Sequence, residues 1–138
     1  MAELDPRRAA WVPYIADLVG RMHLMDWEVR LSDEHPTIAG AVAQVGVTYG
    51  RKLARVYLSE AFLRSEPGEQ RNTIVHELVH IHLDMTTSYA LDQLGREGGA
   101  ALRVMFENAV DALAGVIAPH MPLPPAAKAA SSRKGRRN

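Results

Sequence analysis

The chain contains no cysteine among its 138 residues. This absence excludes disulfides, thiolate zinc sites, iron–sulfur clusters and a cysteine nucleophile. The chain also lacks any apolar run near the roughly 20 residues of a membrane-spanning helix, so we expect no transmembrane segment. Residues 1–8 lack the apolar stretch that follows a basic start in secretory signals, and we therefore expect a cytoplasmic protein.

Acidic residues are absent from residues 119–138, a segment that is rich in Pro and Ala and carries five Lys or Arg. Residues 1–118 hold eleven basic and sixteen acidic residues, so the net charge of zero divides into −5 and +5. We expect one folded domain over residues 1–118 and a disordered tail over residues 119–138, whose composition cannot build a core. The acidic body argues against a dedicated nucleic-acid-binding domain, and only the tail would bind polyanions, weakly.

Alternation of apolar and polar residues predicts three strands, at residues 27–31, 43–49 and 53–58. The short connection at residues 50–52 indicates an antiparallel hairpin between the last two strands. Ahead of the strands, apolar residues recur at helical spacing and predict a helix that begins near Val12. The chain is therefore expected to have an α+β fold around a small sheet.

Two longer helices are expected after the strands. Ser59 caps a short helical turn, and the acidic residues around Pro67 predict the start of a helix over residues 67–83. The three hydroxyl residues at 86–88 are expected to break this helix. A last helical region over residues 89–117 is expected to be interrupted at residues 98–99, where two glycines adjoin.

One motif carries chemistry. His76 and His80 are four residues apart in the first of these helices, so both imidazoles project from one face and can reach a single ion. Glu77 lies beside them and can hold a water on that ion without being a ligand. This is the HExxH arrangement of zinc peptidases.

A catalytic zinc needs a third protein ligand and an open position for water. Glu107 and Asp111 share one helix face, and periodicity alone leaves open whether they are ligands or solvated carboxylates. Asp84 follows on the histidine face, but three ligands at successive turns of one helix span about 12 Å, too far for one ion. The remaining candidates lack a supporting pattern: His82, Asp92, Glu97 and His120.

These motifs resemble those of zincin-type metallopeptidases, specifically gluzincins, in which a second helix carries Glu-x-x-x-Asp. Residues 27–125 also resemble short metallopeptidases of actinobacterial phages and their hosts, in Trp27 to Asp33, Val47 to Gly50 and the two motifs. The resemblance implies a minimal zincin-like fold. Its parts are an N-terminal helix, a small three-stranded, largely antiparallel sheet, the HExxH helix and a C-terminal helix carrying the third ligand.

The resemblance further implies that His76, His80 and Glu107 bind Zn²⁺ and that Asp111 orients a metal-bound histidine. The predicted function is zinc-dependent hydrolysis of peptide bonds in a protein or peptide substrate. Zinc lowers the pKa of bound water from about 15.7 to about 7, and Glu77 acts as general base. One strand within residues 43–58 is expected to be the edge that pairs with the substrate. Several residues could assist the oxyanion, and the sequence selects none of them: Tyr49, Tyr57, Tyr89 and His82.

Three other functions fit the same residues. The chain could be a zinc-binding zincin-fold module without general proteolytic activity, with an interaction or regulatory role in phage or host. It could be a protease with one dedicated target, which would show no general activity. It could also be a protease that the basic tail recruits to nucleic acid.

Overall fold

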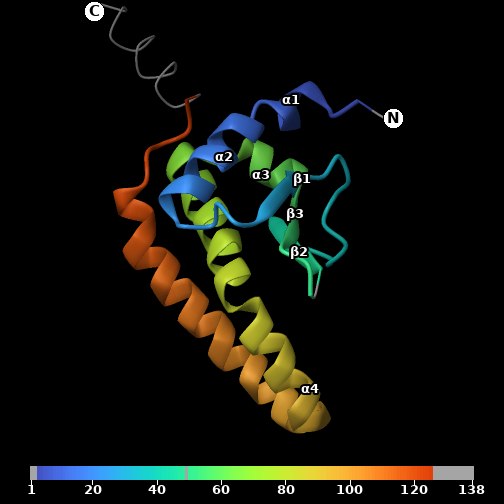
Figure 1. The fold of residues 1–138 in the computed structure, drawn as a ribbon. Helices are drawn as coiled ribbons and strands as arrows, with labels where there is room; N and C mark the ends of the chain where they lie inside the picture. Colours follow the sequence, from blue (N-terminus) through green and yellow to red (C-terminus); the bar gives the residue numbers. More distant parts are fainter. Residues whose placement is uncertain (1–2, 49, 126–138) are drawn as a thin grey trace, which may run out of the picture.

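A small mixed sheet and a long helical hairpin form the framework of the molecule (Figure 1). The computed structural model describes residues 3–48 and 50–125. The sheet holds β1 (Glu28–Leu31), β2 (Ala43–Thr48) and β3 (Leu53–Leu58) in the order β1-β3-β2. The α+β class and the three strands are therefore as the sequence predicts, and β2 lies at an edge.

The expectation of a largely antiparallel sheet is wrong, because only the β2–β3 pair is antiparallel. β1 pairs with β3 in parallel, with Leu31 opposite Val56. The tight connection between β2 and β3 fixes those two strands as a hairpin, which leaves the other edge of β3 free. β1 lies at that edge, and the loop of residues 32–42 crosses the end of β3 to reach β2 at the opposite edge, so β1 and β3 run in the same direction.

The N-terminal helices lie over the core. α1 (Pro6–Ala9) is capped by the Asp5 side chain, which accepts a hydrogen bond from the Arg7 backbone N–H, and α2 spans Val12–Arg21. α2 packs on α4 and β1 and buries Ile15 and Leu18. After the sheet, the Ser59 side chain caps α3 (Glu60–Arg64) by accepting a hydrogen bond from a backbone N–H, as predicted.

α4 spans Pro67–Ile117 and doubles back on itself at Gly95, whose φ of 69° and ψ of −171° are not helical. We call residues 67–94 the first arm and residues 96–117 the second arm. In Figure 1 the arms run antiparallel, and the first arm lies between the sheet and the second arm.

The expected helix breaks at residues 86–88 and 98–99 are therefore wrong. Residues 86–88 are helical, and the Thr87 hydroxyl donates to the Leu83 carbonyl at 2.8 Å, so it is satisfied without breaking the helix. Gly98 and Gly99 instead pack close to leucines of the first arm, since a Cβ on Gly99 would lie 3.5 Å from Leu91.

The end of the described chain crosses back over the body. η1 (Ala118–His120) follows the second arm, the Tyr14 hydroxyl donates to the Pro122 carbonyl at 2.8 Å, and Pro124 is fully buried. Of the expected tail, residues 119–125 thus lie against the body, and residues 126–138 lie outside the described residues. None of the helices within residues 3–48 and 50–125 combines the length and apolarity that crossing a bilayer requires.

The reversal of α4 generates a test of its glycine. The backbone of Gly95 lies in a region that is essentially restricted to glycine, so Gly95→Ala should lower the free energy of unfolding by about 1–3 kcal/mol. Gly68→Ala is the control, because it lies in the same helix with no heavy atom within 4 Å of its added Cβ. Chemical denaturation measures both variants, and a Gly95→Ala protein as stable as the Gly68→Ala protein would contradict the assignment.

Candidate metal centre

The first arm lies between the core and the second arm (Figure 1). Its buried side chains point into the core and include Ile74, Val75, Leu78 and Ile81. His76 and His80 lie one turn apart on the side that faces the second arm, where Glu107 and Asp111 are likewise one turn apart. Val110 and Ala114 are buried and fix the rotation of the second arm, so both carboxylates face the histidines.

Three side chains converge on one point: those of His76, His80 and Glu107. Their nitrogen and oxygen atoms lie within 4.8 Å of one another. His80 Nε2 is 3.2 Å from His76 Nε2 and 2.9 Å from Glu107 Oε1, and His76 Nε2 is 3.5 Å from Glu107 Oε2. The two Glu107 contacts use different oxygens of its carboxylate, so the three side chains form a group that could hold a metal ion after a small adjustment of Glu107.

Asp111 lies behind His76. Its Oδ1 is 3.0 Å from His76 Nδ1, on the opposite side of the ring from the Nε2 that meets Glu107. A carboxylate in this position favours the tautomer with its proton on Nδ1, which leaves Nε2 with a free lone pair. The tautomer that this contact favours is the one that can bind a metal through Nε2.

The protonation state of His80 also suits a metal ligand. Burial lowers the pKa of His80, the Glu107 carboxylate opposes this shift, and the neighbouring His76 adds to it. A lowered pKa keeps the imidazole neutral near pH 7, which is the form that coordinates metals.

Glu77 points toward the sheet instead of joining the cluster. Its side chain lies against β2, and the residue is 8% exposed. Burial, and to a lesser extent the Glu107 carboxylate, raises the pKa of Glu77, while the Val45 backbone N–H, which is directed at the carboxylate, lowers it, and the net result is a pKa of about 7. A carboxyl group with a pKa near 7 can both accept and return a proton at neutral pH.

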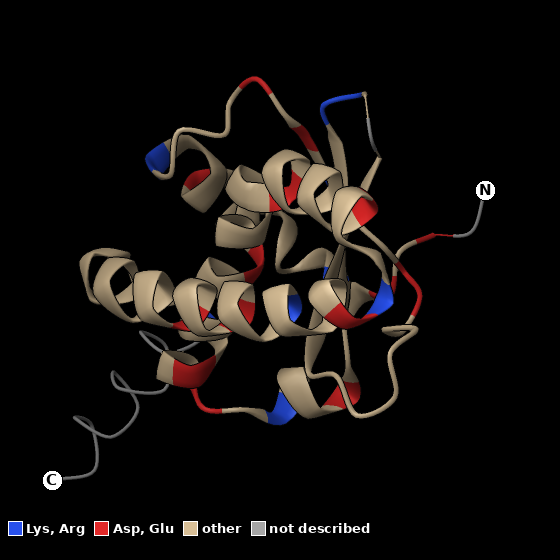
Figure 2. Cartoon of the chain, turned by 90° about the horizontal axis from the view of Figure 1, so that it is seen from below, with Lys and Arg blue, Asp and Glu red and all other residues tan. Residues whose placement is uncertain are grey.

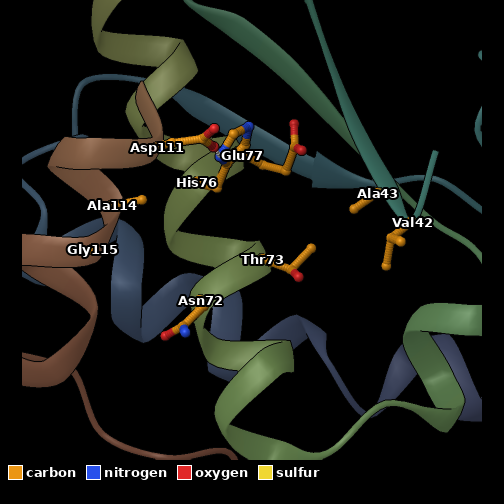
Figure 3. Close-up of a pocket in the computed structure, with 9 residues that line it drawn as sticks. All are labelled: Val42, Ala43, Asn72, Thr73, His76, Glu77, Asp111, Ala114 and Gly115. Carbon is orange, nitrogen blue, oxygen red and sulfur yellow. Dashed lines mark ion pairs between the residues drawn. The ribbon is translucent and has the colours of Figure 1, made fainter. Parts of the chain in front are cut away.

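Of the three cluster residues, His76 lines a pocket of about 390 Å³, together with Glu77 and Asp111 (Figure 3). The start of β2 forms one wall, with Val42 and Ala43, and the second arm forms the other, with Ala114 and Gly115. Between the walls the first arm contributes Asn72, Thr73 and the residues already described. Sequence reasoning missed Asn72 and Thr73, although Asn72 lies one helical turn before His76 and could have been found by that spacing.

The other candidate ligands lie elsewhere. His82 Nε2 is 2.7 Å from the Met22 carbonyl oxygen, on the far side of the first arm. Asp84, whose pKa is raised by burial, lies one turn beyond His80 outside the three-donor cluster. Asp92 and Glu97 are exposed near the reversal at Gly95, and His120 lies in η1.

None of the described residues that could assist an oxyanion lines the pocket. Tyr57 is on β3, Tyr89 is 63% exposed on the first arm, and His82 is engaged with Met22. Tyr49, the remaining candidate, lies outside the described residues.

The chain matches no protein-family model, no curated protein and no solved structure.

The buried carboxyl group predicts a pH-dependent cost to stability. The pKa of Glu77 in the folded metal-free chain is about 7, above the usual value near 4.5, so ionisation disfavours folding increasingly from pH 4.5 to 7. Glu77→Gln removes this cost. In the presence of a chelator, the variant should be more stable than the natural chain by about 2–3 kcal/mol at pH 8 and by close to nothing at pH 4.

Urea denaturation at the two pH values measures this difference. Asp92→Asn is the control, because it removes an exposed carboxylate from the same helix and should change stability little at either pH. A Glu77→Gln protein that gains no stability between pH 4 and pH 8 would show that the carboxyl group is not desolvated as described.

Proposed function

We propose that this chain is a zinc-dependent peptidase in which His76, His80 and Glu107 hold the metal and Glu77 is the general base. The observation that carries the proposal is the three-donor cluster beside a buried carboxyl group, with His76 and Glu77 lining an open pocket. Structural zinc sites use four protein ligands, whereas two histidines and a glutamate leave a position for water and substrate. The donor set thus favours a catalytic role over a structural one.

The chemistry that bound zinc supplies is Lewis acidity, which activates water and polarises the scissile carbonyl. Glu77 accepts the proton of the attacking water and returns it to the leaving amine. The Val45 N–H is directed at the Glu77 carboxylate from β2, and the Asp111 carboxylate lies against Nδ1 of His76. Each group therefore has one task, and the tasks are divided between the two arms and the sheet edge.

β2 is the strand on which a peptide substrate would lie. It is an edge strand next to the pocket, so apart from the Val45 N–H, which is directed at Glu77, its outer side can pair with an extended chain. A substrate paired along β2 would bring a peptide bond past Glu77, and the first arm below it would bring the histidines within reach.

The described part of the chain favours no second kind of substrate. Lys and Arg positions are interspersed with acidic ones and form no basic face in the view of Figure 2. Residues 3–48 and 50–125 hold eleven basic and sixteen acidic residues, a balance opposite to that of a nucleic-acid-binding surface. A peptide is therefore the substrate class that we propose.

Removing the third donor tests the metal site. Glu107→Ala should weaken zinc binding by more than about 100-fold, beyond the effect of losing a residue that only supports a ligand. Elemental analysis of chelator-free protein should find about one zinc per natural chain and almost none in the variant. Glu97→Ala removes an exposed glutamate from the same arm and should keep its zinc, and equal zinc in both variants would exclude Glu107 as a ligand.

Replacing the base tests the chemistry separately from the metal. Glu77→Gln should keep the zinc and lower the rate of hydrolysis of an unstructured protein by about 10²–10⁴-fold, since proton transfer is lost. The measurement compares zinc content and turnover in the same preparations. A natural chain that holds zinc yet hydrolyses nothing would favour the zinc-binding module without general proteolytic activity.

A further inference from the structure

We infer that two copies of this chain pair antiparallel through the outer face of the second arm of α4, the face turned away from the first arm. This pairing does not depend on the proposed function, because Glu107 points from the same arm in the opposite direction, toward the histidines. The partner is a second copy of the chain, and the surface is one that the fold leaves exposed.

The outer face carries apolar side chains that the fold does not bury. Met105 is 67% exposed and Val116 is 68% exposed. They belong to a row of exposed residues that are spaced by three or four along the second arm, so the row lies on one side of the helix. We call this row the outer strip, and it consists of Ala101, Met105, Ala109, Ala112 and Val116.

The outer strip contains no charged residue. Between residues 98 and 117 the charged residues are Arg103, Glu107 and Asp111, which are spaced by four and share one side of the helix. Glu107 and Asp111 contact His80 and His76 across the hairpin, so the charged side faces away from the outer strip. A surface without charge can meet its own copy without repulsion between like charges.

The sizes of its residues make the outer strip complementary to itself. When two strips lie antiparallel with a two-fold axis between residues 108 and 109, Met105 lies opposite Ala112 and Val116 lies opposite Ala101. Each larger side chain then meets an alanine of the other copy, so the two helices can approach closely and interlock. A register that set Met105 opposite Val116 would lose this fit.

An apolar pocket continues the outer strip at its C-terminal end. Besides Arg21 and three histidines, its lining consists of Val116 and Ile117 of the second arm, Met121 and Met22. In the antiparallel pair, residue 97 of one copy lies opposite residue 120 of the other, so the tip of each hairpin reaches this pocket. Leu94 at the tip is 50% exposed and is the large apolar side chain nearest to that level.

The area of the surface determines how strong the pairing can be. Fifteen residues separate Ala101 from Val116, so the strip is about 22 Å long on a helix about 10–12 Å across. Each copy thus contributes roughly 200–400 Å², less than the roughly 800 Å² per partner of a standard interface. We therefore expect a reversible dimer with a Kd of about 1–100 μM.

Sedimentation of the full chain over a range of concentrations tests the pairing. The natural chain should pass from monomer to dimer, and Ala112→Glu should raise the Kd at least about 100-fold, because each pair would bury two unpaired carboxylates. Ala100→Glu is the matched control. It makes the same change at an exposed alanine on the charged side, three residues before Arg103, and it should leave the Kd unchanged. Val116→Glu serves as a second disrupting variant if Ala112→Glu folds poorly.

The absence of cysteine from the natural chain allows the register to be tested directly. Ala109 lies beside the two-fold axis, so two Ala109→Cys chains should form a disulfide on mild oxidation or react with one short bismaleimide linker. Ala101→Cys is the control, because the two copies of residue 101 would be about 22 Å apart along the helix axis. Denaturing gels without reductant should show crosslinked dimer for Ala109→Cys and almost none for Ala101→Cys.

Three results would overturn the inference. A natural chain that stays monomeric up to about 1 mM would leave the outer strip to another kind of partner, such as a different protein or a membrane surface. A dimer that Ala112→Glu and Val116→Glu weaken no more than Ala100→Glu does would place the interface elsewhere. Crosslinking of Ala101→Cys as efficient as that of Ala109→Cys would exclude the antiparallel register.

Discussion

The antiparallel register of the two arms of α4 is the constraint on which the site depends. His80 lies fifteen residues before Gly95 and Glu107 twelve residues after it, about 22 Å and about 18 Å along the two arms. These lengths are close, so the two side chains meet across the hairpin. One turn farther from the reversal, His76 meets Asp111. Because both motifs are spaced by four residues, a single register of the hairpin serves both contacts.

The second arm is held by few large apolar contacts. Its fully buried residues are small or medium in size and comprise Gly99, Val110 and Ala114. The segment after it adds anchorage, because Tyr14 bonds to Pro122 and Pro124 is buried. At the site itself, the carboxyl groups of Glu77, Glu107 and Asp111 lie near two imidazoles, so a divalent cation would relieve the repulsion among them. Under the proposed function, metal binding and closure of the hairpin would stabilise each other.

Much of this arrangement could be read from short-range patterns. The spacing of His76 and His80, the alternation in the strands and the Ser59 cap are local features, and a local feature is visible in the sequence. The Glu107–Asp111 spacing was also visible, although periodicity could not distinguish a ligand face from a solvated one. The contacts between the arms add information that periodicity lacks, because they bring both carboxylates to the histidines.

The failures concern partners that are distant in sequence. The direction of β1 depends on which edge of β3 is free, and the residue pattern within β1 does not predict whether it pairs in parallel or antiparallel. The hydroxyl residues around Thr87 predict a break because hydroxyl side chains compete with the helix, yet the Thr87 hydroxyl donates to a carbonyl of the preceding turn. A single glycine, Gly95, reverses the chain, while the more conspicuous Gly98–Gly99 pair allows close packing. Glycine identity alone does not separate these two uses.

The first arm can carry this chemistry because its successive residues face different surroundings. Ile74, Val75, Leu78 and Ile81 bury one side in the core, and this apolar packing holds the helix in place. His76 and His80 then face the second arm, while Glu77 is turned toward β2 and is desolvated there. The burial that raises the pKa of Glu77 therefore comes from the same packing that positions the histidines. A change that loosens the arm against the sheet would lower that pKa toward its ordinary value and would move the base away from the metal ligands.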